Sequence, residues 1–152
     1  MESTLQNPVL AAGHPISKAK TIVYWIVTAV FCLQVGFTAY AQLRLPQVAA
    51  AFTHLGFPAY FRVELALAKL LGVALLLAPV PARLKEWAYA GFAINLVSAL
   101  VAHLAVGDGA AAWSWSVGTG VLWALSYFFY RRLQGTALAP AWPEASLAPA
   151  GS

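Results

Sequence analysis

A long run without a charged side chain, residues 21–43, constrains the fold of this chain more than any other feature. As a helix, the run spans about 34 Å at ~1.5 Å per residue, which is enough to cross the hydrocarbon core of a bilayer. The rest of the chain has a similar character. Of its 152 residues, 61% are hydrophobic and 9% are charged, whereas soluble domains carry roughly 25% charged residues. We therefore expect an integral membrane protein.

Three further segments have the length and composition of membrane spans: residues 59–79, 87–106 and 112–130. Short connections rich in proline, glycine or charge separate them. Another apolar segment, residues 45–53, is too short to cross a bilayer, and we expect it to lie at the interface or to re-enter the membrane. The sequence thus predicts an all-α fold, namely an integral membrane four-helix bundle with up-down-up-down topology and a short interfacial segment between its first two helices.

Composition divides the chain into three parts. Residues 1–20 form a polar N-terminal leader, residues 21–132 the four-helix transmembrane domain, and residues 133–152 a tail rich in Ala and Pro that is expected to be disordered. Basic residues near the span ends number six on one side of the predicted bundle and two on the other. By the positive-inside rule, both termini are expected in the cytoplasm.

Lys69 is the most informative single residue because it lies near the middle of the second predicted span. Placing a lysine there costs at least ~2.5 kcal/mol, and an ionisable group inside the membrane is a functional candidate by default. The structural alternative is a buried ion pair. Arg62 shares the helix face of Lys69, whereas Glu64 lies about 140° away around the same helix, so we expect neutralising partners to come largely from other helices.

The remaining polar residues converge on the outer half of the predicted bundle, around Lys69. We expect a polar cavity that opens outward, with Lys69 at its floor in contact, directly or through water, with Asp108, Glu64 or His103. The catalytic candidates are Lys69, His103, Asp108 and Glu64. The ligand-binding candidates are His54, Arg62, Gln34 and Asn95.

Each of these residues also has a structural interpretation. Asp108 lies between two glycines, as turn-forming residues often do, and His103 can cap the carbonyls at the end of a helix. His54 can anchor the chain at the interface, and Arg62 can reach lipid head groups. Asn95 belongs to a stripe of small and polar residues that favours close helix packing with hydrogen bonds between helices. The stripe consists of Ala88, Gly91, Asn95, Ser98 and Ala102.

Missing patterns exclude several classes of function. The single cysteine, Cys32, cannot form a disulfide within the chain, and no spacing of His, Cys and acidic residues matches a metal site, so no metal is expected. The sequence contains no phosphate-binding loop, dinucleotide fingerprint or nucleophile elbow. The basic residues occur in small separate pairs, which argues against a nucleic-acid partner.

Four blocks of the sequence follow one another with a definite order and spacing. They are His54-Leu-Gly-Phe-Pro-Ala-Tyr-Phe61, Ala68-Lys-Leu-Leu-Gly72, Arg83-Leu-Lys-Glu-Trp-Ala-Tyr-Ala-Gly-Phe92 and His103-Leu-Ala-Val-Gly-Asp108. Together they resemble the DoxX-like family of small bacterial membrane proteins. The resemblance implies four transmembrane helices in a bacterial cytoplasmic (inner) membrane. The positions of the family's recurrent polar residues are occupied by His54, Lys69, Lys85, Glu86, His103 and Asp108.

The resemblance implies two kinds of function. The wider group takes its name from a subunit of a thiosulfate:quinone oxidoreductase, and it is also similar to an animal chaperone that assists nicotinic-receptor assembly. In the first hypothesis, the cavity binds a lipophilic small molecule such as a quinone, in a redox-associated subunit or a small membrane enzyme. Lys69 and His103 would then contact carbonyl oxygens and transfer protons. In the second, the protein is a non-catalytic assembly factor or chaperone that contacts other membrane proteins or a further copy of itself.

Overall fold

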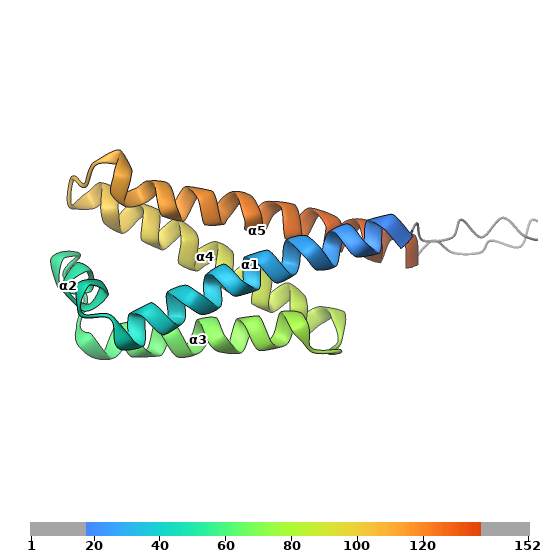
Figure 1. Cartoon of the computed structure of the whole chain (residues 1–152), viewed down its shortest axis with the longest axis horizontal. Helices are drawn as coiled ribbons and strands as arrows, with labels where there is room; N and C mark the ends of the chain where they lie inside the picture. Colours follow the sequence, from blue (N-terminus) through green and yellow to red (C-terminus); the bar gives the residue numbers. More distant parts are fainter. Residues whose placement is uncertain (1–17, 138–152) are drawn as a thin grey trace, which may run out of the picture.

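The computed structural model describes residues 18–137, which fold into five helices without a strand (Figure 1). The helices are α1 (Lys18–Arg44), α2 (Pro46–His54), α3 (Ala59–Leu77), α4 (Ala82–Ala105) and α5 (Ala110–Ala137). The predicted all-α class is confirmed for this part of the chain. The short helix α2 corresponds to the short segment expected between the first two long helices.

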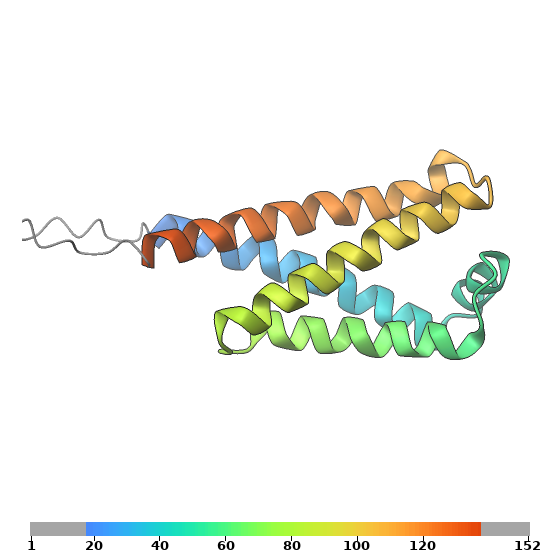
Figure 2. The same cartoon turned by 180° about the vertical axis from the view of Figure 1, so that it is seen from behind.

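The four long helices form a ring in which each packs against two others. Both α1 and α4 lie beside α3 and α5, so α1 and α4 occupy opposite corners. Successive long helices run in opposite directions, which gives an up-down-up-down arrangement (Figures 1 and 2). α1 begins and α5 ends at one end of the bundle, which we call the terminal end. The opposite end, where α2 lies, is the α2 end, and the corresponding halves are the terminal half and the α2 half.

At the α2 end the long helices separate into two pairs. α1 lies near α3 there, α4 lies near α5, and α2 lies between the two pairs (Figures 1 and 2). No Cα atom of α2 comes within 8 Å of one in α4 or α5, although α2 approaches α1 and α3 within that range. The link from α2 to the second helix pair therefore depends on side chains.

The packed core lies in the terminal half. Phe31, Leu76 and Tyr89 are 0%, 0% and 1% exposed, and the rings of Phe31 and Phe92 meet edge to face with their centroids 5.2 Å apart. Gly72 permits this packing, because a Cβ atom at that position would lie 2.6 Å from the Phe92 ring. Close approach of α3 and α4 in this half thus requires glycine.

A buried hydroxyl network adds to this core. Ser126 Oγ lies 2.8 Å from Thr28 Oγ1 and 2.7 Å from the Tyr89 hydroxyl. These side chains come from α5, α1 and α4, so the network joins three of the four long helices. Because each of these buried hydroxyls has a hydrogen-bond partner, the network links these helices without leaving one of its members unsatisfied.

α4 begins earlier than the sequence predicts. The helix begins at Ala82, after Pro81 at the N-cap position, so residues 83–86, expected to be a charged loop, lie in its first turns. Proline is compatible with the start of a helix, because the first backbone N–H groups have no partner within the helix. The connection between α3 and α4 is therefore short, residues 78–81.

The described residues cover only part of the predicted leader and tail. Residues 18–20, expected to belong to the leader, form the start of α1. Residues 133–137, which the sequence assigns to the tail, are helical and continue α5. Leu133, the first residue of this extension, packs against the core. The rest of both predictions falls on residues 1–17 and 138–152, which lie outside the described part of the chain.

Candidate functional site

A cavity of about 760 Å³ occupies the α2 half, and we call it the main cavity. All five helices contribute to its wall, which is predominantly apolar. Its hydrophilic lining residues are Thr38, Gln42, Lys69, Asn95, Ser98 and His103. Three of the predicted site residues therefore border the same cavity. They are Lys69 near the middle of α3, Asn95 near the middle of α4 and His103 near the end of α4.

Small side chains on α4 provide the room for the main cavity. Gly91, Asn95, Ser98 and Ala102 belong to the stripe that the sequence suggests as a packing face, and all four line the main cavity. Neither Asn95 nor Ser98 forms a side-chain hydrogen bond with another described residue. In the α2 half, the stripe is therefore a cavity wall and not a helix contact.

Lys69 and Asn95 lie where three cavities meet. Besides the main cavity, both residues line two smaller cavities of about 70 Å³ and about 240 Å³, and no other described residue lines all three. On α3, Phe61, Leu65 and Lys69 follow at steps of four and line the main cavity together, as residues on one side of a helix do. Lys69 is thus on the side of α3 that faces the bundle interior.

Lys69 has no counter-charge in the described part of the chain. It forms no hydrogen bond or ion pair with another described residue, so the predicted direct contact with Asp108, Glu64 or His103 is absent. Glu64 is exposed on α3 and lines none of the three cavities. Its position about 140° from Lys69 around the helix explains this separation.

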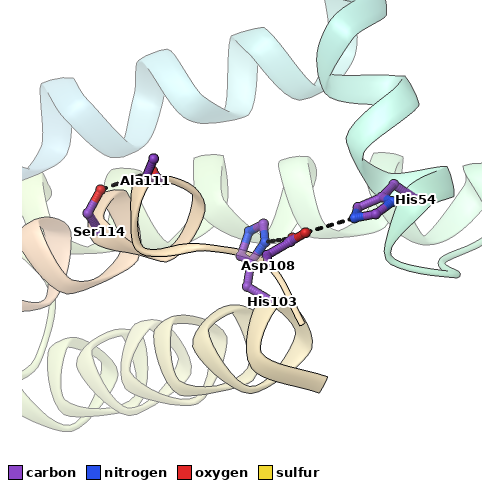
Figure 3. A network of polar contacts seen from close by, with 5 residues as sticks. All are labelled: His54, His103, Asp108, Ala111 and Ser114. Carbon is purple, nitrogen blue, oxygen red and sulfur yellow. Dashed lines mark hydrogen bonds and ion pairs between the residues drawn. The ribbon is translucent and has the colours of Figure 1, made fainter. Parts of the chain in front are cut away.

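Asp108 bridges two histidines at the α2 end (Figure 3). Its Oδ1 lies 2.9 Å from His54 Nε2, and its Oδ2 lies 2.6 Å from His103 Nδ1. His54 is the last residue of α2 and His103 lies in the last turn of α4, so this carboxylate bridge joins α2 to the second helix pair. The hydrogen bond from His103, and then that from His54, lowers the pKa of the Asp108 carboxyl below its ordinary value.

The backbone at the end of α4 positions Asp108 for this bridge. Gly107 adopts a φ of +77°, its N–H donates to the Leu104 carbonyl, and the N–H of Asp108 donates to the His103 carbonyl. This pattern is a Schellman motif, in which a left-handed glycine turns the chain back over the last helical turn. The motif brings the Asp108 carboxylate against the His103 ring.

α2 ends in the same way. Gly56 adopts a φ of +80°, its N–H donates to the Thr53 carbonyl, and the N–H of Phe57 donates to the Phe52 carbonyl. The side chains that meet across this second motif are the rings of Phe52 and Phe57, with centroids 6.0 Å apart. Two helices beside the main cavity thus end in glycine turns, one closed by an aromatic pair and the other by an acid–histidine pair.

His103 connects the carboxylate bridge to the main cavity. Its side chain lines the cavity while Nδ1 contacts Asp108, and a carboxylate that accepts from Nδ1–H leaves Nε2 as the nitrogen that can accept a proton. His103 is separated from Asn95 by about 12 Å along α4, at ~1.5 Å per residue. Lys69 and Asn95 therefore form the floor of the cavity and His103 lies at its rim.

Arg62 and Gln34 have structural partners and line none of the three cavities. Arg62 donates a hydrogen bond to the Gln42 carbonyl, which ties α3 to the end of α1. Gln34 Nε2 donates to Thr119 Oγ1 over 2.8 Å, which ties α1 to α5. Their described contacts hold helices together at the edge of the site.

Sequence reasoning missed two hydrophilic residues of the cavity wall, Thr38 and Gln42. A signal for them exists, because they are four residues apart and so lie on one side of α1.

Within residues 18–137, no group of three or more His, Cys, Asp or Glu side chains is arranged to hold a metal ion.

The outward faces of all four long helices carry exposed apolar side chains. Examples with more than half of their surface exposed are Ile26, Leu33, Leu67, Leu71, Val97 and Val121. Two helices, α1 and α4, are long and apolar enough to cross a membrane, judged by length and composition. Extended exposed apolar surface of this kind indicates a membrane interaction, so the class of protein is a helical membrane protein.

The chain belongs to the DoxX-like family, whose family model matches residues 26–126. This confirms the family that the four sequence blocks predict. The matched part contains every residue that lines the main cavity and all three members of the carboxylate bridge. Neither a curated protein nor a solved structure matches the chain.

Proposed function

We propose that this chain is a four-span protein of the bacterial inner membrane with both termini in the cytoplasm. The charged helix α3 supports four spans, because it exposes Leu67 and Leu71 on the side opposite Lys69. The excess of basic residues near the terminal end supports a cytoplasmic location of that end. In this orientation the main cavity lies in the outer half of the membrane.

Cysteine labelling tests this orientation. In a Cys32→Ser background, Gly109→Cys at the α2 end should react with a membrane-impermeant maleimide in intact cells. Arg83→Cys at the terminal end should react only after lysis. The reverse pattern would show that the bundle is inverted.

For the main cavity, the proposed function is binding of a lipophilic small molecule with a polar head group, such as a quinone. The observation that carries this proposal is a cavity of about 760 Å³ with apolar walls and few hydrophilic groups. Ligand pockets have volumes of roughly 300–1,000 Å³ and the same division between apolar walls and a few polar groups. The Lys69 ammonium and the Asn95 amide donate hydrogen bonds to the head group at the floor.

His103 and Asp108 support a proton-transfer role at the rim of the cavity. A histidine held by a carboxylate is a common acid–base pair in catalysis, and His103 borders the cavity. Glu64, the fourth catalytic candidate, is exposed and lines none of the three cavities, so it has no part in this proposal. The role fits either a redox-associated subunit or a small membrane enzyme.

Ligand binding in neutral-lipid nanodiscs tests the proposal, with decylubiquinone as the probe. Ser98→Phe should abolish binding, because its ring occupies the main cavity. Val121→Phe, on the exposed face of α5, is the matched control and should bind like the wild type. Equal binding by both variants would exclude the cavity as the site. A chain that binds no lipophile but purifies in a stable complex with another membrane protein would favour the assembly-factor alternative.

A further inference from the structure

We infer that the head group that meets Lys69 is an anion, so that the protein binds an anionic amphiphile, a long-chain carboxylate. This inference rests on the proposed ligand-binding function and narrows the class of ligand. Two observations carry it: the uncompensated charge of Lys69, and an apolar groove that begins at Lys69 and opens on the surface of the bundle.

No carboxylate in the described part of the chain lines any of the three cavities. Asp108 is engaged in the carboxylate bridge. Glu86 accepts hydrogen bonds from the Tyr127 hydroxyl, at 3.0 Å, and from Arg131, at 3.2 Å. Glu64 is exposed. None of these acids lines any of the cavities that Lys69 borders.

Lys69 is therefore a cation in largely apolar surroundings. A buried charge is costly unless an opposite charge and hydrogen bonds compensate it. A carboxylate provides both, because it carries the opposite charge and accepts hydrogen bonds that are stronger than those of a neutral acceptor. The carbonyl of a neutral ligand would leave the charge of Lys69 uncompensated. The neighbouring Asn95 amide offers a further donor to the second carboxylate oxygen.

The cavity of about 240 Å³ between α3 and α4, which we call the side groove, provides the place for the chain of the ligand. Lys69 and Asn95 are its hydrophilic lining residues apart from the indole of Trp87, and they also line the main cavity. Trp87 and Leu71 line the groove and are 79% and 62% exposed. The groove thus opens on the outer surface of the bundle, where an alkyl chain can enter from lipid.

Two glycines allow a matched test of the side groove. Gly91 lines both the groove and the main cavity, and Gly118 on α5 lines none of the three cavities. A Cβ atom at either glycine meets nothing within 4 Å. Gly91→Leu therefore fills the groove without a direct clash at Cβ, and Gly118→Leu is the control for the same change elsewhere.

The experiment compares cis-parinaric acid with its methyl ester, two fluorescent probes that share one chain and differ in charge. Binding is measured at pH 8 in nanodiscs of phosphatidylcholine. The wild type should bind the acid at least about 10-fold more tightly than the ester, as expected for a charge-assisted hydrogen bond. Lys69→Met should lower the affinity for the acid to that for the ester, and Lys69→Arg should retain the preference. Gly91→Leu should lose both probes, whereas Gly118→Leu should bind both.

Several results would overturn the inference. If the wild type binds the ester as tightly as the acid, or if Lys69→Met keeps the preference, the head group is not recognised as an anion, although the proposed ligand-binding function survives. If the wild type binds neither probe nor decylubiquinone, the proposed function fails as well. If Lys69→Met does not fold, two measurements remain. The wild-type comparison of acid and ester tests whether the head group is recognised as an anion, and the two glycine variants test whether the side groove holds the chain of the ligand.

Discussion

The two halves of the bundle use their polar groups differently. In the terminal half, Ser126 is hydrogen-bonded to both Thr28 and Tyr89 in a buried network, and aromatic rings fill the surrounding space. In the α2 half, the side chains of Lys69 and Asn95 line the main cavity and have no hydrogen-bond partner among the described residues. The network hydroxyls of the first half are satisfied within a packed core, whereas these two side chains of the second half remain unpaired, within the described part of the chain, beside a cavity.

This difference shows how a small bundle can combine stability with a cavity lined by unpaired polar side chains. Sites that keep unpaired polar groups and cavities reduce stability, so the rest of the fold must supply it. Here the terminal half supplies this stability, because the largest fully buried side chains form its core. We expect the α2 half to open locally at a lower free energy than the terminal half.

The largest expected effect compares two phenylalanines of α1. Phe31 is 0% exposed in the core, whereas Phe37 is 59% exposed and lines the main cavity. Phe31→Ala should lower the free energy of unfolding by about 3–5 kcal/mol, because it leaves a void in packed surroundings. Phe37→Ala should cost below ~1 kcal/mol. Unfolding in mixed micelles measures both, and equal losses would show that the two halves are packed alike.

A smaller contrast is expected for two glycines on neighbouring helices. Gly72→Ala should destabilise the bundle by about 1–3 kcal/mol, because its Cβ would meet the ring of Phe92, which Phe31 holds in place. Gly91→Ala should stabilise the bundle by up to ~1 kcal/mol, since alanine favours helix and the site is open. A destabilised Gly91→Ala variant would mean that the stripe on α4 packs against another helix.

The contrast at the α2 end concerns local opening more than overall stability. Asp108→Ala removes the carboxylate bridge and should increase amide hydrogen exchange in α2, while the unfolding transition of the bundle changes little. Glu64→Ala, at an exposed acid with no ion pair in the described structure, is the control and should leave exchange in α2 unchanged. Unaltered protection of α2 in Asp108→Ala would show that other contacts hold this helix.

The smallest effect is a dependence on pH. Because hydrogen bonding lowers the pKa of Asp108 in the folded protein, the bridge contributes stability above the ordinary carboxyl pKa of about 4, and this contribution is lost as the pH falls through the lower folded value. Spin labels at Thr53→Cys and Gly109→Cys in a Cys32→Ser background should move apart at that acidic pH. The same movement in an Asp108→Ala background would assign it to another group.

The sequence predicts the helices well because their causes are local. Charge-free runs and prolines locate all four long helices, and the spacing of His103 and Asp108 places both at one helix end. The exact ends are less well predicted, because α1 and α5 extend past the charge-free runs into charged residues. α4 also begins early, because a charged segment after Pro81 fits a first helical turn as well as a loop.

The site is harder to predict because it depends on neighbouring helices. Lys69 was expected to find an acid or a histidine, but which residues face it is set by the rotation of three other helices. The stripe that contains Asn95 was expected to favour packing. Small residues permit both close approach and open space, and only the neighbouring helices decide between these outcomes.

The carboxylate bridge also bears on the order in which the chain assembles. The contact of Asp108 with His103 spans five positions in the sequence, whereas its contact with His54 spans 54. Local contacts form early because little chain entropy is lost in closing them. The Asp108–His103 pair can therefore form as soon as α4 is complete. The Asp108 carboxylate is then already in position when His54 of α2 binds to it. The last contact to form, and the first to break, is then the one made by His54.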